Sequence, residues 1–176
     1  PIGVGAGRNG RAALGVKDAR ATASELSARI KALEPGDLTS DSIAALRADI
    51  AQLDAQLAPA ADLLRGDPLV GLARGFGPTR DQVVAADGLV DAADALVEAA
   101  GLGLDMGAEV AALRQSGDGA AGLIGGLVGV IAGSTERVDR IATLLGTAQQ
   151  ALATMPATAV AQLQEARALI AEPLDR

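Results

Sequence analysis

The residues best suited to chemistry in this sequence are carboxylates that recur between positions 87 and 109. Spacings of 4, 3, 4, 7 and 4 place them on one face of a helix, and the set is Asp87, Asp91, Asp94, Glu98, Asp105 and Glu109. Such a stripe can bind divalent cations or a basic partner. Calcium loops, however, gather their oxygen ligands on a tight turn, and the sequence lacks the D-x-D-x-D-G pattern of such a turn. We interpret the stripe as a solvated face that arginines from neighbouring helices partly neutralise.

Most other side chains that carry catalysis are missing. The 176 residues include no His, Cys or Tyr, which removes the commonest general bases, the thiolate nucleophile and the usual zinc ligands. Lys17 and Lys31, the only lysines, fall in one predicted helix with no serine motif nearby. The sequence therefore predicts that the protein is not an enzyme. It predicts no catalytic, cofactor-binding or metal-binding residues and no cofactor.

Two short motifs match known signatures by spelling alone. Residues 5–10, GAGRNG, fit G-x-G-x-x-G, but a dinucleotide site needs a buried strand before that motif and a helix after it. Residues 1–4 are too few for such a strand, so we interpret 1–10 as a flexible, glycine-rich lead-in. Residues 65–67 spell the cell-adhesion tripeptide RGD. Gly66 and Pro68 are typical of a helix end, and we interpret the tripeptide as a helix stop.

Glycines recur at every fourth position between residues 122 and 133. They are Gly125, Gly129 and Gly133, with Gly122 and Gly126 in a neighbouring row. A ridge of small residues lets two helix backbones approach closely, and in lipid it marks a dimer face. The ridge can pack against an Ala-rich helix of the same chain or against another copy of the chain. We favour packing within the chain.

Charge and hydropathy narrow the classes of partner. The chain has 15 basic and 22 acidic residues and a net charge of −7, whereas nucleic acids and anionic membranes bind clustered cations. The basic residues are scattered, so we expect no nucleic-acid partner. No stretch reaches the roughly 18–20 apolar residues of a membrane span. The nearest is residues 120–133, which is too short and rich in glycine.

Composition and periodicity both predict helices. Hydrophobic residues make up 49% of the chain, yet Phe76 is the only aromatic residue and alanine abounds, a composition that favours helix over strand. Apolar residues recur at alternating steps of three and four, as on one face of a helix. The expected stripe of the second helix is Ile43, Leu46, Ile50, Leu53, Leu57, Ala60 and Leu64. That of the third is Val83, Ala86, Val90, Ala93, Val97, Ala100 and Leu104, and that of the fourth is Ile124, Leu127, Ile131, Val138, Ile141, Leu145, Ala148 and Leu152.

Turn and cap residues divide these stripes into elements. Thr39 or Ser40 is a suitable N-cap for the second helix, and Pro59 predicts a kink or a boundary within it. Pro78 suits the first turn of a third helix. Residues 116–119, SGDG, predict the break before a fourth helix, and residues 155–156, MP, close it before a fifth.

These elements predict an all-α fold, an elongated antiparallel bundle of four to five long Ala/Leu-rich helices. Its expected parts are the lead-in 1–10, a helical hairpin over 11–65 and a linker over 66–77 with about one helical turn. A long helical hairpin with a C-terminal helix occupies 78–176. Together they form one helical module.

Four segments of the sequence resemble the helical N-terminal half of the DUF4012 domain family, bacterial membrane proteins of unknown function. They are VKDARATASELSARIKAL at 16–33, the GDL turn at 36–38, DPLVGLARGFGPTRDQVVAADGLVDAADALVEAA at 67–100 and MPATAVAQLQEARALIAEPLDR at 155–176. The Gly-Phe-Gly-Pro linker departs from the more usual Pro-aliphatic-Gly. The resemblance implies a transmembrane helix before Pro1, an extracytoplasmic position, and a further α/β domain after Arg176 that carries any chemistry.

The expected function is that of a non-catalytic extracytoplasmic stalk or interaction module of a membrane-anchored cell-envelope protein. Its partners would be the membrane, through a flanking segment, and either further copies of the chain or another envelope protein. A chemoreceptor-like sensory bundle is the alternative, although a sensor usually turns Arg or aromatic residues into a ligand pocket. A lipid-surface binder is a third reading, which the acidic balance disfavours.

Overall fold

Every regular element of the described residues is a helix. A computed structural model describes residues 21–26, 28–29, 31–32, 39–116 and 119–174, and no strand occurs among them. The described part of 21–32 is helical. The named helices that follow are α2 (Ser40–Gly66), α3 (Pro68–Gly75), α4 (Gly77–Gln115), α5 (Gly119–Ala153) and α6 (Ala161–Leu174). The all-α prediction is confirmed, whereas the lead-in 1–10 lies outside the described residues.

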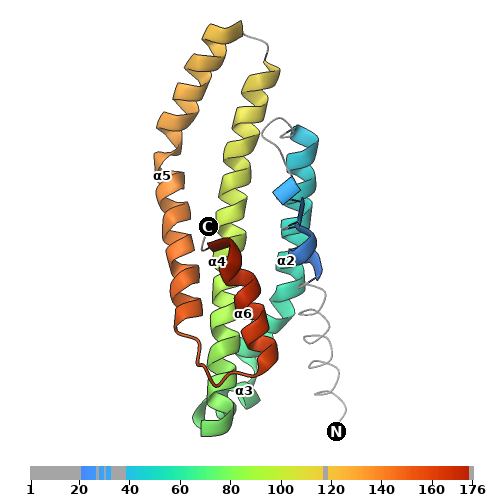
Figure 1. Cartoon of the computed structure of the whole chain (residues 1–176), viewed down its shortest axis with the longest axis vertical. Helices are drawn as coiled ribbons and strands as arrows, with labels where there is room; N and C mark the ends of the chain where they lie inside the picture. Colours follow the sequence, from blue (N-terminus) through green and yellow to red (C-terminus); the bar gives the residue numbers. More distant parts are fainter. Residues whose placement is uncertain (1–20, 27, 30, 33–38, 117–118, 175–176) are drawn as a thin grey trace.

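Helix α4 lies between α2 and α5 and contacts every other named helix (Figure 1). Polar contacts join Gln115 at the end of α4 to Ser40 at the start of α2, and Arg65 near the end of α2 to Asp91 on α4. The two helices therefore run in opposite directions. Glu109 on α4 pairs with Arg137 on α5, and Gly88 approaches Ala151, so α5 also runs opposite to α4.

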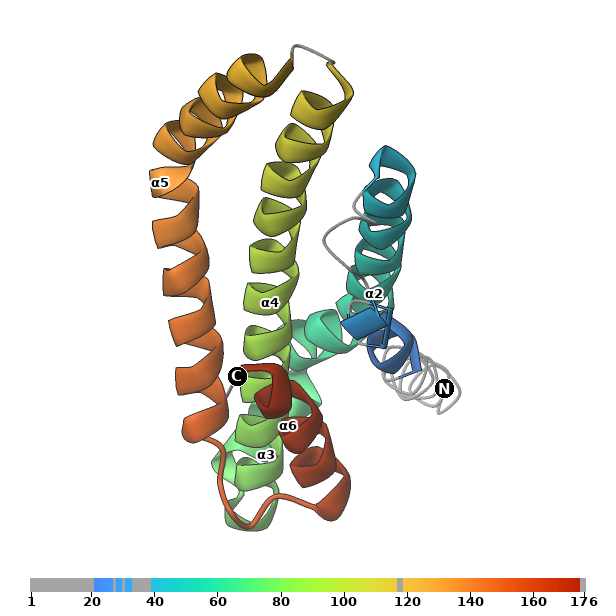
Figure 2. The ribbon, with the colours of Figure 1, turned by 45° about the horizontal axis from the view of Figure 1, so that its top comes forward.

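The cap of α2 satisfies backbone groups that the helix leaves unpaired. Thr39 is the N-cap, as expected: its hydroxyl accepts from the Ser42 N–H at 3.2 Å, and the Ser42 hydroxyl accepts from the Thr39 N–H at 2.9 Å. Pro59 does not end the helix, which continues to Gly66. Figure 2 shows the two halves of α2 pointing in different directions, the bend that an interior proline imposes.

The segment expected as a linker with about one helical turn contains a complete short helix, α3. Asp67 separates it from α2, and the Asp67 carboxylate accepts from the Leu69 N–H at 2.8 Å. Pro68 occupies the first turn, where a missing N–H costs nothing. The extended backbone of Phe76 then separates α3 from α4.

Helix α4 is continuous over 39 residues, through Gly101, Gly103 and Gly107. Pro78 lies in its first turn, as predicted. At 1.5 Å per residue α4 is about 58 Å long, and α5, with 35 residues, is about 52 Å long. The tertiary contacts along α4 outweigh the propensity cost of its glycines.

The core between α4 and α5 is lined by small side chains. Its buried members from α4 are Ala85, Ala92, Ala95 and Ala99, and those facing them are Leu144, Ala148, Leu152, Met155 and Ala159. The stripe expected for the third helix is displaced, because only Val90 of that set is buried. The reason is that α4 has partners on two sides, so its apolar residues are shared between two contact faces. The stripe of α2 is closer to expectation, with Ile43, Leu46, Ile50 and Ala60 buried.

A polar clasp joins the connection before α6 to the start of α4. The Gln82 side-chain amide donates to the Thr158 carbonyl at 3.0 Å and accepts from the Val160 N–H at 2.8 Å. The Thr158 hydroxyl donates to Asp81 at 2.5 Å. These bonds satisfy backbone groups of an irregular segment that crosses the helix.

We expect the glycines of α4 to respond oppositely to substitution. A Cβ at Gly88 would lie 3.0 Å from the Ala151 carbonyl oxygen, whereas one at Gly103 meets nothing within 4 Å. Gly88→Val should therefore lower the free energy of unfolding by about 1–3 kcal/mol through overpacking. Gly103→Ala, the matched control, should raise it by about 0.5–1 kcal/mol through helix propensity. Urea unfolding followed by circular dichroism measures both, and a neutral Gly88→Val would contradict the close approach.

Candidate functional site

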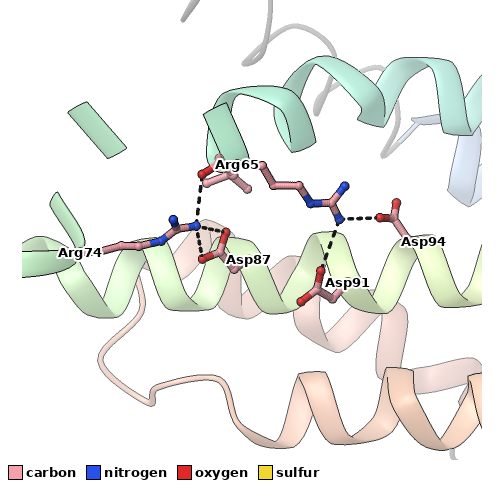
Figure 3. A network of polar contacts seen from close by, with 6 residues as sticks. Arg65, Arg74, Asp87, Asp91 and Asp94 are labelled. Carbon is pink, nitrogen blue, oxygen red and sulfur yellow. Dashed lines mark hydrogen bonds and ion pairs between the residues drawn. The ribbon is translucent and has the colours of Figure 1, made fainter. Parts of the chain in front are cut away.

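The acidic stripe of α4 is matched by arginines from the helices around it. Figure 3 shows Arg65 from α2 reaching toward the stripe, with its Nη2 2.8 Å from Asp94 and 3.4 Å from Asp91. Arg74 from α3 donates through one nitrogen to both carboxylate oxygens of Asp87, at 3.0 and 2.8 Å, and to the Leu64 carbonyl at 3.1 Å. One arginine thus ties α4 to both α2 and α3.

The rest of the stripe is paired in the same way. Arg47 from α2 lies 2.5 Å from Asp105. From the opposite side, Arg140 of α5 makes two bonds to one oxygen of Glu98, at 2.9 and 2.7 Å. Arg137 of α5 engages both oxygens of Glu109, at 2.6 and 3.0 Å. Every acid of the stripe has an arginine partner, which confirms and extends the interpretation as a partly neutralised face.

These ion pairs shift the pKa values of their strongest members. The hydrogen bond from Arg137 lowers the pKa of Glu109 below its ordinary value, and the same bond raises the pKa of Arg137. The hydrogen bond to Asp94 raises the pKa of Arg65. Each shift favours the charged form, so Glu109 is poorly suited to proton transfer near neutral pH.

The spaces beside the stripe are open grooves. One, of about 390 Å³, lies between α2 and α4 and is lined by Asp54, Ala58, Ala61, Asp62, Arg65, Asp94, Val97 and Glu98. A second lies between α4 and α5, beside Asp91, Asp94, Thr147 and Gln150. Among the described residues no group of three or more His, Cys, Asp or Glu side chains is placed to hold a metal ion. The geometry of the described residues supports polar contacts at a surface.

The two motifs matched by spelling have different outcomes. Residues 5–10 lie outside the described part of the chain. In the RGD tripeptide, Arg65 binds the stripe of α4, Gly66 ends α2 and Asp67 caps α3. The helix-stop interpretation is confirmed, because each of its residues has a role within the fold.

The glycine ridge does not pack as expected. Among the described glycines of this region, Gly126 faces Leu113 of α4, but a Cβ on Gly125, Gly129 or Gly133 would meet nothing within 4 Å. The prediction of packing within the chain is therefore wrong for Gly125, Gly129 and Gly133, whereas Gly126 contacts α4 as expected.

The apolar stripe expected for the fourth helix divides into two parts. Its second half is packed, with Leu145 half-buried and Ala148 and Leu152 buried. Its first half is exposed: the exposed fractions are 65% for Ile124, 40% for Leu127, 66% for Ile131 and 48% for Val138. In this half Gly126 and Arg137 of α5 face α4 instead. Between them Val130 is half-buried and Ser134 is buried. Sequence reasoning missed the exposure because two faces of the helix carry aliphatic residues.

Other large apolar side chains are exposed near α3. They are Leu69, Leu72 and Phe76, with exposed fractions of 72%, 66% and 72%.

None of the described helices is long and apolar enough to cross a membrane. In comparisons with protein-family models, curated proteins and solved structures, the chain has no significant match.

The Glu109–Arg137 pair should make part of the stability depend on pH. Because its folded-state pKa is lowered, Glu109 stabilises the fold above the unfolded-chain pKa, near pH 4.3, and this contribution disappears as pH falls through the lower folded-state pKa. Glu109→Gln should reduce the melting temperature at pH 7 by roughly 1–3 °C. The difference from the unaltered protein should shrink at pH 3.

The control for this prediction is Glu136→Gln on α5, an exposed carboxylate that pairs with no described residue. It should leave the melting temperature almost unchanged at pH 7. A Glu109→Gln deficit that is equal at pH 7 and pH 3 in calorimetry would contradict the ionic origin of the effect.

Proposed function

We propose that this chain is a non-catalytic helical stalk and interaction module on the extracytoplasmic face of a membrane-anchored bacterial cell-envelope protein. In this proposal four to five long helices form an elongated antiparallel bundle that spaces or assembles the rest of the protein. The membrane anchor and any chemistry belong to parts of the protein outside this chain. The resemblance of its helical segments to the DUF4012 domain family supplies the cellular context.

The observation that carries the proposal is the use of charged and apolar groups in the bundle. The carboxylates of α4 are engaged by arginines of α2, α3 and α5. An aliphatic face of α5 is exposed at the same time. Paired charges hold helices together, and exposed apolar surface is typical of protein contacts. This distribution favours a module that associates over one that converts a substrate.

A sensory bundle is the second candidate, and the groove between α2 and α4 favours it. That groove has a volume of about 390 Å³ and contains Arg65, a group able to bind a carboxylate ligand. Against this reading, Arg65 already binds Asp91 and Asp94. A carboxylate ligand would have to displace an existing ion pair, so the stalk remains the better-supported function.

Membrane topology tests the stalk proposal in the natural gene product that carries this chain. Produced in a bacterial host, that product should sediment with membranes, and its helical module should be cleaved by protease added to intact spheroplasts. A cytoplasmic protein in the same cells, cut only after lysis, is the control. Recovery of the module in the soluble fraction, or protection until lysis, would overturn the proposed placement.

Ligand-induced stabilisation separates the stalk from the sensor. We expect less than about 1 °C change in melting temperature when the chain is mixed with amino acids or small dicarboxylates at millimolar concentration, because no ligand binds the folded state preferentially. A rise of several degrees that Arg65→Gln abolishes would assign the α2–α4 groove to ligand binding and favour the sensor.

A further inference from the structure

The exposed aliphatic residues of α5 form a regular seam. Ile124, Val128, Ile131, Thr135, Val138 and Ala142 follow one another at steps of 4, 3, 4, 3 and 4, and all six are exposed. The exposed fraction reaches 66% at Ile131 and 60% at Val128. We call this set the outer seam. Its step pattern is that of a coiled-coil contact, in which each apolar residue inserts between residues of a second helix.

A second, separate face of the same helix already has a partner. Ile141, Leu144, Ala148 and Leu152 pack in the core against α4 and its neighbours, while Arg137 pairs with Glu109. Helix α5 therefore has two apolar faces, and α4 covers only one. The uncovered face exposes large aliphatic side chains, which a solvated helix face does not require.

We propose that the outer seam binds the outer seam of a second copy of this chain, with the two α5 helices antiparallel across a twofold axis at Ile131. In that arrangement Ile131 contacts its own counterpart and Ile124 lies opposite Val138 of the other copy. Val128 lies beside Thr135, offset by one residue along the helix. A twofold contact of one surface with itself closes the assembly as a dimer. The inference rests on the proposed role as an interaction module and names its partner.

Charge is the first reason to choose a second copy. Each chain has a net charge of −7, so two copies repel over most of their surfaces. Residues 119–135 contain no charged residue, which makes this half of α5 the place where two copies approach at least electrostatic cost. A lipid surface fits less well, because Arg137 and Arg140, the cations nearest the seam, are engaged by Glu109 and Glu98.

Charge also selects the orientation. Asp139 borders the outer seam at its end. In an antiparallel pair centred on Ile131 the two Asp139 residues are separated by about 24 Å along the helix axes, from 1.5 Å per residue. A parallel pair would bring them within about 10 Å, the usual distance between packed helices. The antiparallel pair avoids that repulsion.

The size of the seam agrees with a dimer of moderate affinity. Half-exposed aliphatic side chains of this kind each offer on the order of 60–100 Å² of apolar surface. With Leu127 at its border, 40% exposed, the seam offers about 500 Å² per copy and about 1,000 Å² per pair, the lower bound for a specific protein interface. A dimer that forms at micromolar concentration is the expected result.

Sedimentation velocity of the chain over 1–200 µM tests association. We expect a shift from monomer to dimer that strengthens between 50 and 500 mM NaCl, because salt screens the repulsion between acidic copies. Ile131→Glu should weaken the dimer at least tenfold. Leu72→Glu on α3 is the matched control, because Leu72 has the same exposed fraction of 66%, and it should leave association unchanged.

Cysteine cross-linking tests the arrangement, since the chain contains no cysteine. Under mild oxidation Ile131→Cys should form a disulfide-linked dimer by itself. Ile124→Cys and Val138→Cys should each stay uncross-linked alone and form a mixed dimer when combined, because only opposed Cβ atoms come within disulfide reach.

A monomer at 200 µM, or equal effects of Ile131→Glu and Leu72→Glu, overturns the dimer. Self-cross-linking by all three cysteine variants overturns the antiparallel orientation. Flotation of monomeric chain with phosphatidylglycerol vesicles, lost in Ile131→Glu, assigns the seam to lipid and also overturns the proposal. None of these results alters the protease accessibility of the natural gene product, so failure of the dimer and failure of the stalk are distinguishable.

Discussion

The structure depends on the pairing of α4 carboxylates with arginines from three different helices. A seam of alanines lets helices come close but offers few large side chains to fix their relative position along the axis. Arginines provide that information, because Arg65, Arg74 and Arg137 each reach one defined acid or adjacent pair of acids. Exposed ion pairs contribute little stability one by one. Their value here is to select one register among several sterically similar ones.

The core of small residues drives helix packing, whereas the charged face selects the register of the helices. Close approach of α4 and α5 occurs where Gly88 meets the Ala151 backbone and where Gly126 receives Leu113. Burial of alanine, leucine and methionine supplies the driving force for packing. Because α4 is the common partner of α2, α3, α5 and α6, the described part of the fold is organised around one helix.

Local features of the fold were predictable from the sequence, whereas the choice of faces was not. Thr39, Pro78 and the break at residues 116–119 identify helix ends because capping and proline chemistry act within a few residues. Pro59 was ambiguous, because a long helix tolerates one bend. The buried face of α5 could not be chosen along its whole length. The expected stripe placed Ile124 and Ile141 together, but the position of α4 leaves Ile124 exposed and packs Ile141 against the core. The acidic stripe was recognised, but its arginine partners lie 13 to 58 residues away along the chain.

Surface charges set the helix register, and small aliphatic residues form the core. This division affects which positions tolerate substitution during evolution. Alanine, glycine, serine and valine can replace one another at many core positions with modest cost, as long as the helices stay close. The spacing between an acid and its arginine is less free to drift, since a shift of one residue turns the side chain away by about 100°. Homology between bundles of this design would then be detectable from the spacing between charged residues, even after most of the packed core residues had been substituted.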